Sequence, residues 1–123
     1  MQFNNRSFIS GYDNLHIDFQ ENLCIKDSII FKNCNNLEVR INSKINKLIF
    51  KNCNNVSLKC SATVCGIDIE KCLDFILIPL DPYNLKLIEI YKSKIDFLLD
   101  KKFNFSNTSF DNQLSIINLK RIN

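Results

Sequence analysis

The sequence predicts an all-β fold, a parallel β-helix of about five stacked coils, and the main observation behind this prediction is an internal repeat. The hexapeptide Phe-Lys-Asn-Cys-Asn-Asn occurs at 31–36 and again at 50–55. The following apolar positions match at the same offset: Leu37, Val39, Ile41 and Ile45 correspond to Val56, Leu58, Cys60 and Val64, and a third copy continues through Ile69, Cys72, Phe75 and Leu77. A fixed period of about 19 residues is typical of a solenoid, in which each unit stacks on the one before it.

Apolar and polar residues alternate within each copy, which predicts strands rather than helices. The alternating apolar positions in one copy are Leu48, Phe50, Val56, Leu58 and Cys60. Breaks at 54–55, at 61–63 and near Gly66 predict corners, because Asn and Gly tolerate the left-handed backbone that a tight corner needs. Each coil is therefore expected to hold two or three short strands, which gain a common core by stacking at roughly 4.8 Å.

The repeat divides one expected domain, residues 1–123, into an irregular first coil, regular coils and a closing strand. The ranges are 1–28 for the irregular coil (its strands from about residue 8), 29–47, 48–66, 67–86 and 87–107 for the regular coils, and 108–123 for the closing strand. Alternating residues mark strands in the first coil, the last regular coil and the closing segment, at Leu15, Ile17 and Phe19, at Ile88, Ile90, Phe97 and Leu99, and at Leu114, Ile116, Ile117 and Leu119. Pro79 and Pro82 predict a bulge or corner over 79–84, because proline cannot donate to a strand ladder.

Charge and hydropathy exclude several classes of protein. The net charge is +3, and all of it falls in residues 1–62, which is too little to predict nucleic-acid binding. The sequence holds no apolar run long enough for a transmembrane helix, and its first six residues lack the apolar core of a signal peptide. The chain is therefore expected in the cytoplasm, away from membranes and nucleic acid.

Three cysteines follow the repeat and predict an inward column. Cys34, Cys53 and Cys72 are separated from one another by the repeat offset. A column of buried, reduced thiols is the favoured interpretation, since free Cys packs as a small apolar residue and a cytosolic chain keeps its thiols reduced. A redox or disulfide role and a metal site stay open. The metal site has little support, because the chain has no Cys-x-x-Cys pair and His16 is its only histidine.

Other candidates for chemistry are weak, so no catalytic residue, cofactor or metal is predicted. His16 alternates with Leu15 and Ile17 and is expected at the surface. Asp68, Glu70 and Asp74 flank strands without any sign of the cleft in which paired carboxylates would act as acid and base. The two glycines of the chain do not form a phosphate-binding loop.

The outward positions give a more informative pattern. At the repeat offset Lys32 stacks on Lys51 and then Glu70, while Arg40 stacks on Lys59. Apolar residues fall beside or within these columns at Ile30, Ile49, Ile76 and Ile78. Like charges on adjacent strands are destabilising, so basic columns with apolar neighbours indicate a surface for a partner protein. The alternative is that the lysines only keep an exposed sheet soluble. The open ends of the solenoid offer a further contact surface, for a homodimer.

The same residues resemble a known family. The segment 48–58, Leu-Ile-Phe-Lys-Asn-Cys-Asn-Asn-Val-Ser-Leu, its copy at 29–39 and the segment 66–72 are similar to coils of the C-terminal domain of cyclase-associated proteins. The segment 87–99 resembles a later coil of that domain, and 107–119 resembles its closing strand. The resemblance covers roughly 8–119. It implies a right-handed parallel β-helix related to tubulin-binding cofactor C.

The resemblance also implies a function, which is binding of actin monomers and assistance of nucleotide exchange without chemistry of its own. The expected partner-binding residues are the outward side chains of the second to fourth coils, Lys32, Arg40, Lys51, Lys59 and Glu70. Activation of a GTPase, as in the cofactor C branch, is not favoured, because Arg40 lies in Glu-Val-Arg-Ile without the glutamine of that motif. The alternative hypothesis is a structural or assembly β-helix protein, viral or parasitic for example, that does not bind actin.

Overall fold

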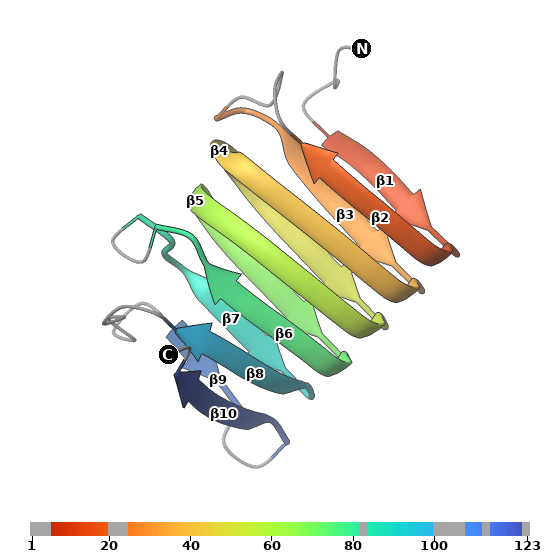
Figure 1. Ribbon diagram of the computed structural model, residues 1–123, viewed down its shortest axis with the longest axis vertical. Coiled ribbons are helices and arrows are strands. Elements are labelled where there is room, and N and C mark those ends of the chain that lie inside the picture. Colours follow the sequence, from red (N-terminus) through yellow and green to blue (C-terminus); the bar gives the residue numbers. More distant parts are fainter. Residues whose placement is uncertain (1–5, 20–24, 82–83, 100–107, 112–113, 122–123) are drawn as a thin grey trace.

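The computed structural model describes residues 6–19, 25–81, 84–99, 108–111 and 114–121, and the regular elements in these ranges are all β-strands (Figure 1). In chain order they are β1 (Arg6–Ser10), β2 (Asp13–Phe19), β3 (Ser28–Lys32), β4 (Asn35–Lys51), β5 (Asn54–Glu70), β6 (Leu73–Pro79), β7 (Ile88–Tyr91), β8 (Lys94–Leu99), β9 (Thr108–Phe110) and β10 (Ile116–Arg121). Pro79 is the last residue of β6, in agreement with the break predicted there. Cys24 and Pro82 lie outside the described residues.

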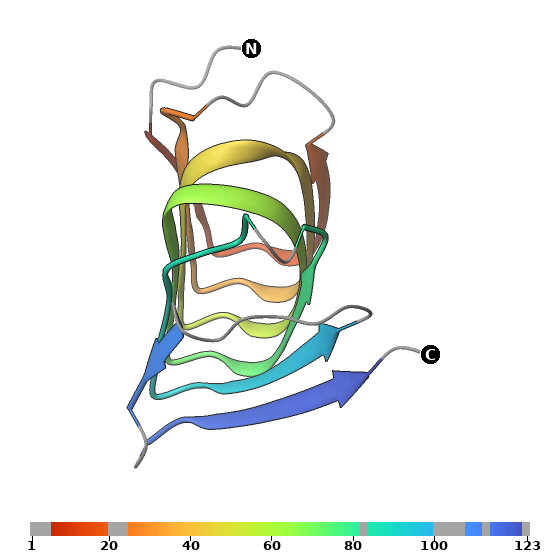
Figure 2. The same ribbon diagram turned by 90° about the vertical axis from the view of Figure 1, so that its left-hand side faces the viewer.

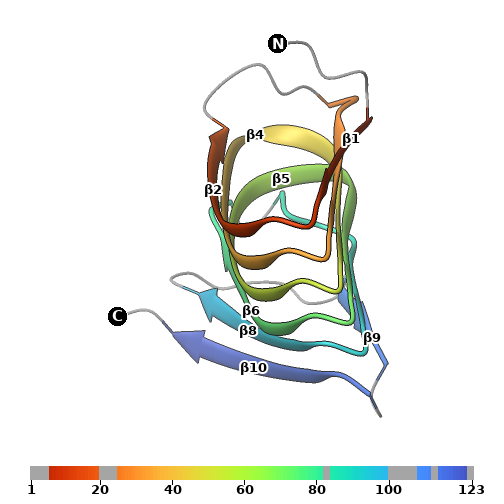
Figure 3. The same ribbon diagram turned by 90° about the vertical axis from the view of Figure 1, so that its right-hand side faces the viewer.

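The strands wind into a parallel β-helix with two walls, which confirms the predicted fold class. Every pairing among the described strands is parallel. The front wall consists of β2, β6, β8, β10 and the first parts of β4 and β5, residues 35–41 and 54–60. The back wall consists of β1, β3, β7, β9 and the last parts of β4 and β5, residues 47–51 and 66–70. Figures 2 and 3 show the walls joined by the arcs of β4 and β5 on one side and by tight corners on the other.

The sequence offset between paired strands equals the repeat length in the middle of the solenoid and becomes longer at both ends. Lys32, Lys51 and Glu70 pair in succession, as the repeat predicts. At the N-terminal end Arg6 pairs with Ser28, and at the C-terminal end Lys94 pairs with Ile116, so the coils at both ends are longer than those in the middle. The extra residues fall in connections between strands, where a longer loop adds little entropic cost.

The strands β4 and β5 correct the prediction of a break at 61–63 and of a match between Ile45 and Val64. Each runs without interruption through the bend, and a register shift there pairs Ile45 with Thr63. Thr63 is buried and its hydroxyl donates to the Lys86 carbonyl at 3.0 Å, whereas Val64 is 43% exposed. The shift arises because β5 has one residue fewer than β4 between the paired positions at this point of the bend. As a result, the side chain that faces inward changes to that of the neighbouring residue.

The C-terminal segment also differs from its prediction. In place of one closing strand over 108–123, the described residues form β9 on the back wall and β10 on the front wall. Leu114, which was expected in the strand, is exposed and precedes β10. Because the offset between paired strands is longer here than in the internal repeat, the apolar positions no longer coincide with it.

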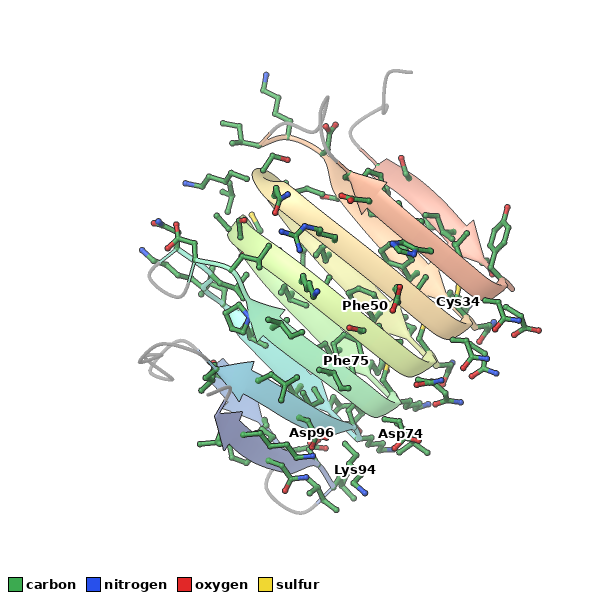
Figure 4. All side chains as sticks on the ribbon, viewed as in Figure 1. Cys34, Phe50, Asp74, Phe75, Lys94 and Asp96 are labelled. Carbon is green, nitrogen blue, oxygen red and sulfur yellow. The ribbon has the colours of Figure 1, made fainter. Side chains whose placement is uncertain are left out.

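Phenylalanine rings form the centre of the core, where Figure 4 labels Phe50 and Phe75. Phe50 is fully buried, its ring stacks on that of Phe31 at 4.8 Å, and it meets the edge of Phe75 at 5.0 Å. Aromatic pairs in these geometries contribute about 0.5–1.5 kcal/mol beyond the burial of their area. Parallel in-register stacking creates the first contact, because Phe31 and Phe50 are partners in adjacent coils.

Asparagines at the tight corners adopt the left-handed conformation that the sequence predicted. Asn33, Asn36, Asn52 and Asn55 all have φ between 52° and 56°. The Asn36 amide donates to the Asn14 side chain at 3.0 Å, and the Asn55 amide donates in turn to Asn36. The corners are therefore fixed both by backbone preference and by hydrogen bonds from coil to coil.

The column of Cys34 (labelled in Figure 4), Cys53 and Cys72 lies inside the same corners, as predicted, and its thiols are buried and free of disulfides. The Cys53 thiol donates to the Phe31 carbonyl at 3.5 Å, one coil earlier. Burial raises the pKa of the Cys34 thiol, and a hydrogen bond with Cys53, together with burial, raises the pKa of Cys72. Cys34 and Cys72 are held protonated in this way and are therefore poor nucleophiles.

Two serines continue the column beyond the part that the sequence identified. Ser93 accepts a hydrogen bond from the Cys72 backbone N–H at 3.0 Å, and Ser115 accepts one from the Ser93 N–H at 3.2 Å. Both serines are buried. The inward corner position is thus occupied by small side chains through five successive coils, as Cys34, Cys53, Cys72, Ser93 and Ser115.

Replacing Phe50 with Ala should lower the free energy of unfolding by about 3–5 kcal/mol, because the change empties the centre of the core. Urea unfolding of the wild type and the variant measures the difference. Phe50→Leu is the matched control and should lose less, since it keeps most of the apolar volume. A loss below about 1 kcal/mol for Phe50→Ala would show that Phe50 does not fill the core.

Cys34, Cys53 and Cys72 should react with a thiol reagent far more slowly in the native protein than Cys65, which is exposed. The physical reason is that reagent reaches a buried thiol only after local unfolding. Peptide mapping by mass spectrometry gives the rate for each cysteine, and the unfolded chain provides the reference. Equal rates for the column and for Cys65 would contradict the stacking register.

Candidate functional site

The five predicted partner-binding residues lie on outward columns, but the fold divides them between two walls. Lys32, Lys51 and Glu70 follow one another across the back wall. Arg40 and Lys59 are neighbours on the front wall. The two groups face opposite sides of the solenoid, so one flat partner surface meets one group or the other.

The front wall is the larger face and combines apolar and basic side chains. One outward column contains His16, Glu38, Ser57 and Ile76. The neighbouring column contains Asp18, Arg40, Lys59 and Ile78. Ile76 and Ile78 are half-buried, so their apolar surface lies within a sheet face that no described element covers.

Two shallow hollows follow these columns. A hollow of about 120 Å³ is lined by His16, Glu38, Val39, Arg40, Ser57 and Lys59. A second, of about 310 Å³, lies toward the asparagine corners and shares His16, Glu38 and Ser57 with the first. His16 lies at the surface, as predicted, and its Nδ1 is 3.1 Å from a carboxylate oxygen of Glu38. The front wall therefore has shallow depressions lined by side chains of mixed polarity rather than a deep cavity.

The back wall separates its charges along the solenoid. Lys32, Lys47 and Lys51 lie on β3 and β4, together with the outward Ile30 and Ile49. Asp68, Glu70 and Glu89 follow on β5 and β7. Where the halves meet, Lys47 contacts Asp68 at 3.0 Å and Lys51 contacts Glu70 at 3.9 Å.

A hollow of about 520 Å³ lies over the acidic half of the back wall. It is lined by Asp68, Ile69, Glu70, Glu89, Ile90, Tyr91, Ser109, Phe110 and Asp111. Glu89, Tyr91 and Asp111 were not identified from the sequence, because Glu89 pairs with Asp68 at a longer offset than the repeat has. The alternation Ile88, Glu89, Ile90, Tyr91 was the available signal, since it places Glu89 and Tyr91 outward once the strand is recognised.

Two carboxylates near the C-terminal end hold low pKa values. The side-chain amide of Asn118 donates to Asp96 at 3.0 Å and, with Lys120 at 3.1 Å, lowers the pKa of Asp96 (labelled in Figure 4). Desolvation alone would raise the pKa of Asp111, but hydrogen bonds from the Ser115 hydroxyl and the Lys92 backbone N–H lower it. Both groups are therefore acceptors near neutral pH, engaged with their own chain.

The described part of the chain shows no evident catalytic or metal-binding centre. The described residues contain no group of three or more His, Cys, Asp or Glu side chains that could hold a metal ion. Among the same residues no helix is long and apolar enough to cross a membrane. What the geometry offers is two exposed sheet faces, each with its own pattern of charge.

Comparison with known proteins identifies the family. The family model described as "Adenylate cyclase associated (CAP) C terminal" matches residues 2–95. Among solved structures, the crystal structure of the cyclase-associated protein from Cryptosporidium parvum is similar to the whole chain, with a TM-score of 0.79 and 16% sequence identity, over 74% of its own chain. At that identity the likeness shows the fold alone. No curated protein matches the sequence.

Proposed function

This chain belongs to the adenylate cyclase associated (CAP) C-terminal family, and we propose from this premise that it binds actin monomers and assists exchange of their nucleotide. The observation that carries the proposal is the agreement of the family match with a β-helix whose walls are exposed sheet faces. Binding of this kind needs complementary surface rather than catalytic groups. We therefore propose a module without chemistry of its own, acting in the cytoplasm.

The front wall is the contact surface that we propose for actin. Six strands of about seven residues give a face of about 650 Å², which approaches the roughly 800 Å² per partner of a standard interface. Arg40 and Lys59 supply positive charge beside the apolar Ile76 and Ile78. An acidic partner surface with apolar side chains would complement this arrangement, with burial of the isoleucines giving affinity and the charges giving orientation.

Lys32, Lys51 and Glu70 form the second candidate contact, on the back wall. They are weaker candidates, because Lys51 already lies 3.9 Å from Glu70 and the neighbouring Lys47 is paired with Asp68. A partner would have to replace these contacts within the chain with contacts of its own. The back wall is also narrower, since its strands have about five residues.

The double variant Arg40→Glu/Lys59→Glu should weaken binding to ADP-actin at least tenfold, a loss of about 1.4 kcal/mol. Both side chains point outward on the proposed face, so reversing their charge opposes an acidic partner without emptying the core. Fluorescence titration of labelled ADP-actin measures the affinity, and release of a fluorescent nucleotide measures exchange. A thermal melt establishes that the variant is folded.

The matched control is Lys32→Glu/Lys51→Glu, which reverses the same charge on the back wall and should leave binding nearly unchanged. If the control loses binding and the front-wall variant keeps it, actin remains the partner but the contact lies on the back wall. If the wild-type protein does not bind ADP-actin or ATP-actin at tens of micromolar, actin binding is rejected. The alternative of an assembly protein would then be favoured.

A further inference from the structure

The basic half of the back wall carries an apolar stripe, which consists of the outward side chains of Phe8, Ile30 and Ile49 in three successive coils. Phe8 is 69% exposed, and the two isoleucines are half-buried. Basic side chains flank the stripe on both sides, Arg6 and Lys47 in one neighbouring column and Lys32 and Lys51 in the other. This arrangement is complementary to a segment in which acidic side chains flank apolar ones.

The column of the apolar stripe continues into the acidic half of the wall, where it carries Asp68 and then Glu89. The hollow of about 520 Å³ lies beside these two carboxylates. Where the halves meet, the lysines of β4 are already paired with carboxylates of β5. Lys32 and Glu89, in contrast, form no ion pair with another described residue. A positive charge on one half and a negative charge on the other are therefore available to a partner.

The spacing of the stripe matches the pitch of an α-helix. Its side chains follow one another at about 4.8 Å, the distance between paired strands. A helix that lies along the solenoid axis presents one side chain to the wall in every turn, or about every 5.4 Å, so the mismatch over three coils is only about 1.2 Å. An extended strand in the same direction would present its side chains about 6.6 Å apart and would lose the match sooner.

We propose that the back wall binds one amphipathic α-helix of a partner protein, which lies along the solenoid axis. One half of this helix places apolar side chains on the stripe and acidic side chains beside Lys32. The other half places basic side chains over Asp68 and Glu89. The six strands of the wall span about 24 Å, which corresponds to about 16 residues of helix.

A helix with both charges fits this wall better than an anionic membrane does. A membrane surface would attract the basic half, but the acidic half belongs to the same wall and would be repelled. A helix about 10 Å wide covers less area than a standard interface, so the expected affinity is micromolar. The front wall stays uncovered, and the inference therefore does not depend on actin binding.

A synthetic peptide of about 18 residues is the probe that tests the proposal. Its first half has one leucine in every turn with glutamates beside the leucines, and its second half has lysines at the positions that correspond to the leucines. Fluorescence anisotropy of the labelled peptide should show micromolar binding to the full chain, and circular dichroism should show that the bound peptide gains helix. A control peptide of the same composition, with its leucines distributed around the helix, should bind about tenfold more weakly or not at all.

Lys32→Glu and Phe8→Ser should each raise the dissociation constant of the peptide about tenfold or more, because one reverses a charge beside the stripe and the other removes its most exposed apolar side chain. The matched controls are Lys94→Glu and Leu119→Ser, which change exposed side chains near the C-terminal end and should leave peptide binding unchanged. A peptide with glutamates in place of its second-half lysines should bind Glu89→Lys more tightly than it binds the wild type. Thermal melts establish that every variant is folded.

Three results would overturn the proposal. The first is a wild type that does not bind the peptide at about 500 µM. The second is peptide binding that Lys32→Glu and Phe8→Ser both leave unchanged. The third comes from cosedimentation with vesicles of phosphatidylcholine and phosphatidylserine: if the wild type binds the vesicles and Lys32→Glu does not, the stripe is assigned to a membrane surface instead of a helix. The expected result is that neither protein binds the vesicles.

Discussion

Parallel stacking in register is the constraint on which the rest of the structure depends. It places Phe31 on Phe50 in the core and Cys34 beside Cys53, with Cys72 next, at the corners. The strands in each coil are too short to bury their apolar sides alone, so each coil is stable only against its neighbours. The residue type at each position is therefore constrained by the column in which its side chain stacks. The same constraint determines which side chains each wall presents to solvent.

The repeat made the fold predictable because stacking requires similar side chains at equivalent positions. The fold class, the buried cysteine column and the outward columns of Lys32 and Arg40 all followed from a single repeat offset. The prediction became wrong where the offset changed. Because β5 has one residue fewer than β4 within the bend, Val64 faces outward and Thr63 faces inward. Longer connections near the C-terminal end obscured β9 and the outward position of Glu89 in the sequence pattern. Alternation alone cannot detect such shifts, since a strand that slips by one residue still alternates.

The candidate site was less predictable than the fold, because a column says which residues are neighbours but not which columns share a face. Lys51 at the end of β4 and Lys59 in β5 are close in the sequence, and both belong to basic columns, which suggested a common surface. The corner between β4 and β5 separates them onto opposite walls. A column can be assigned to a wall only when the conformation of the corners is known. The asparagines with positive φ define that conformation, but they can be interpreted as corners only after the strands are placed.

The C-terminal end shows how a solenoid can finish its backbone pairing while leaving apolar surface uncovered. At successive corners a backbone N–H donates to the next coil: Asn52 to the Glu70 carbonyl and Lys71 to the Tyr91 carbonyl. At the last of these corners the Lys92 N–H instead donates to the Asp111 carboxylate at 3.2 Å. The Asp111 side chain, which follows β9 in the next coil, thus accepts in place of a backbone carbonyl of that coil, and the Lys92 N–H is not left without an acceptor. Because Leu119 remains exposed nearby, contact with this end would be driven by apolar burial rather than by that corner's hydrogen bonds.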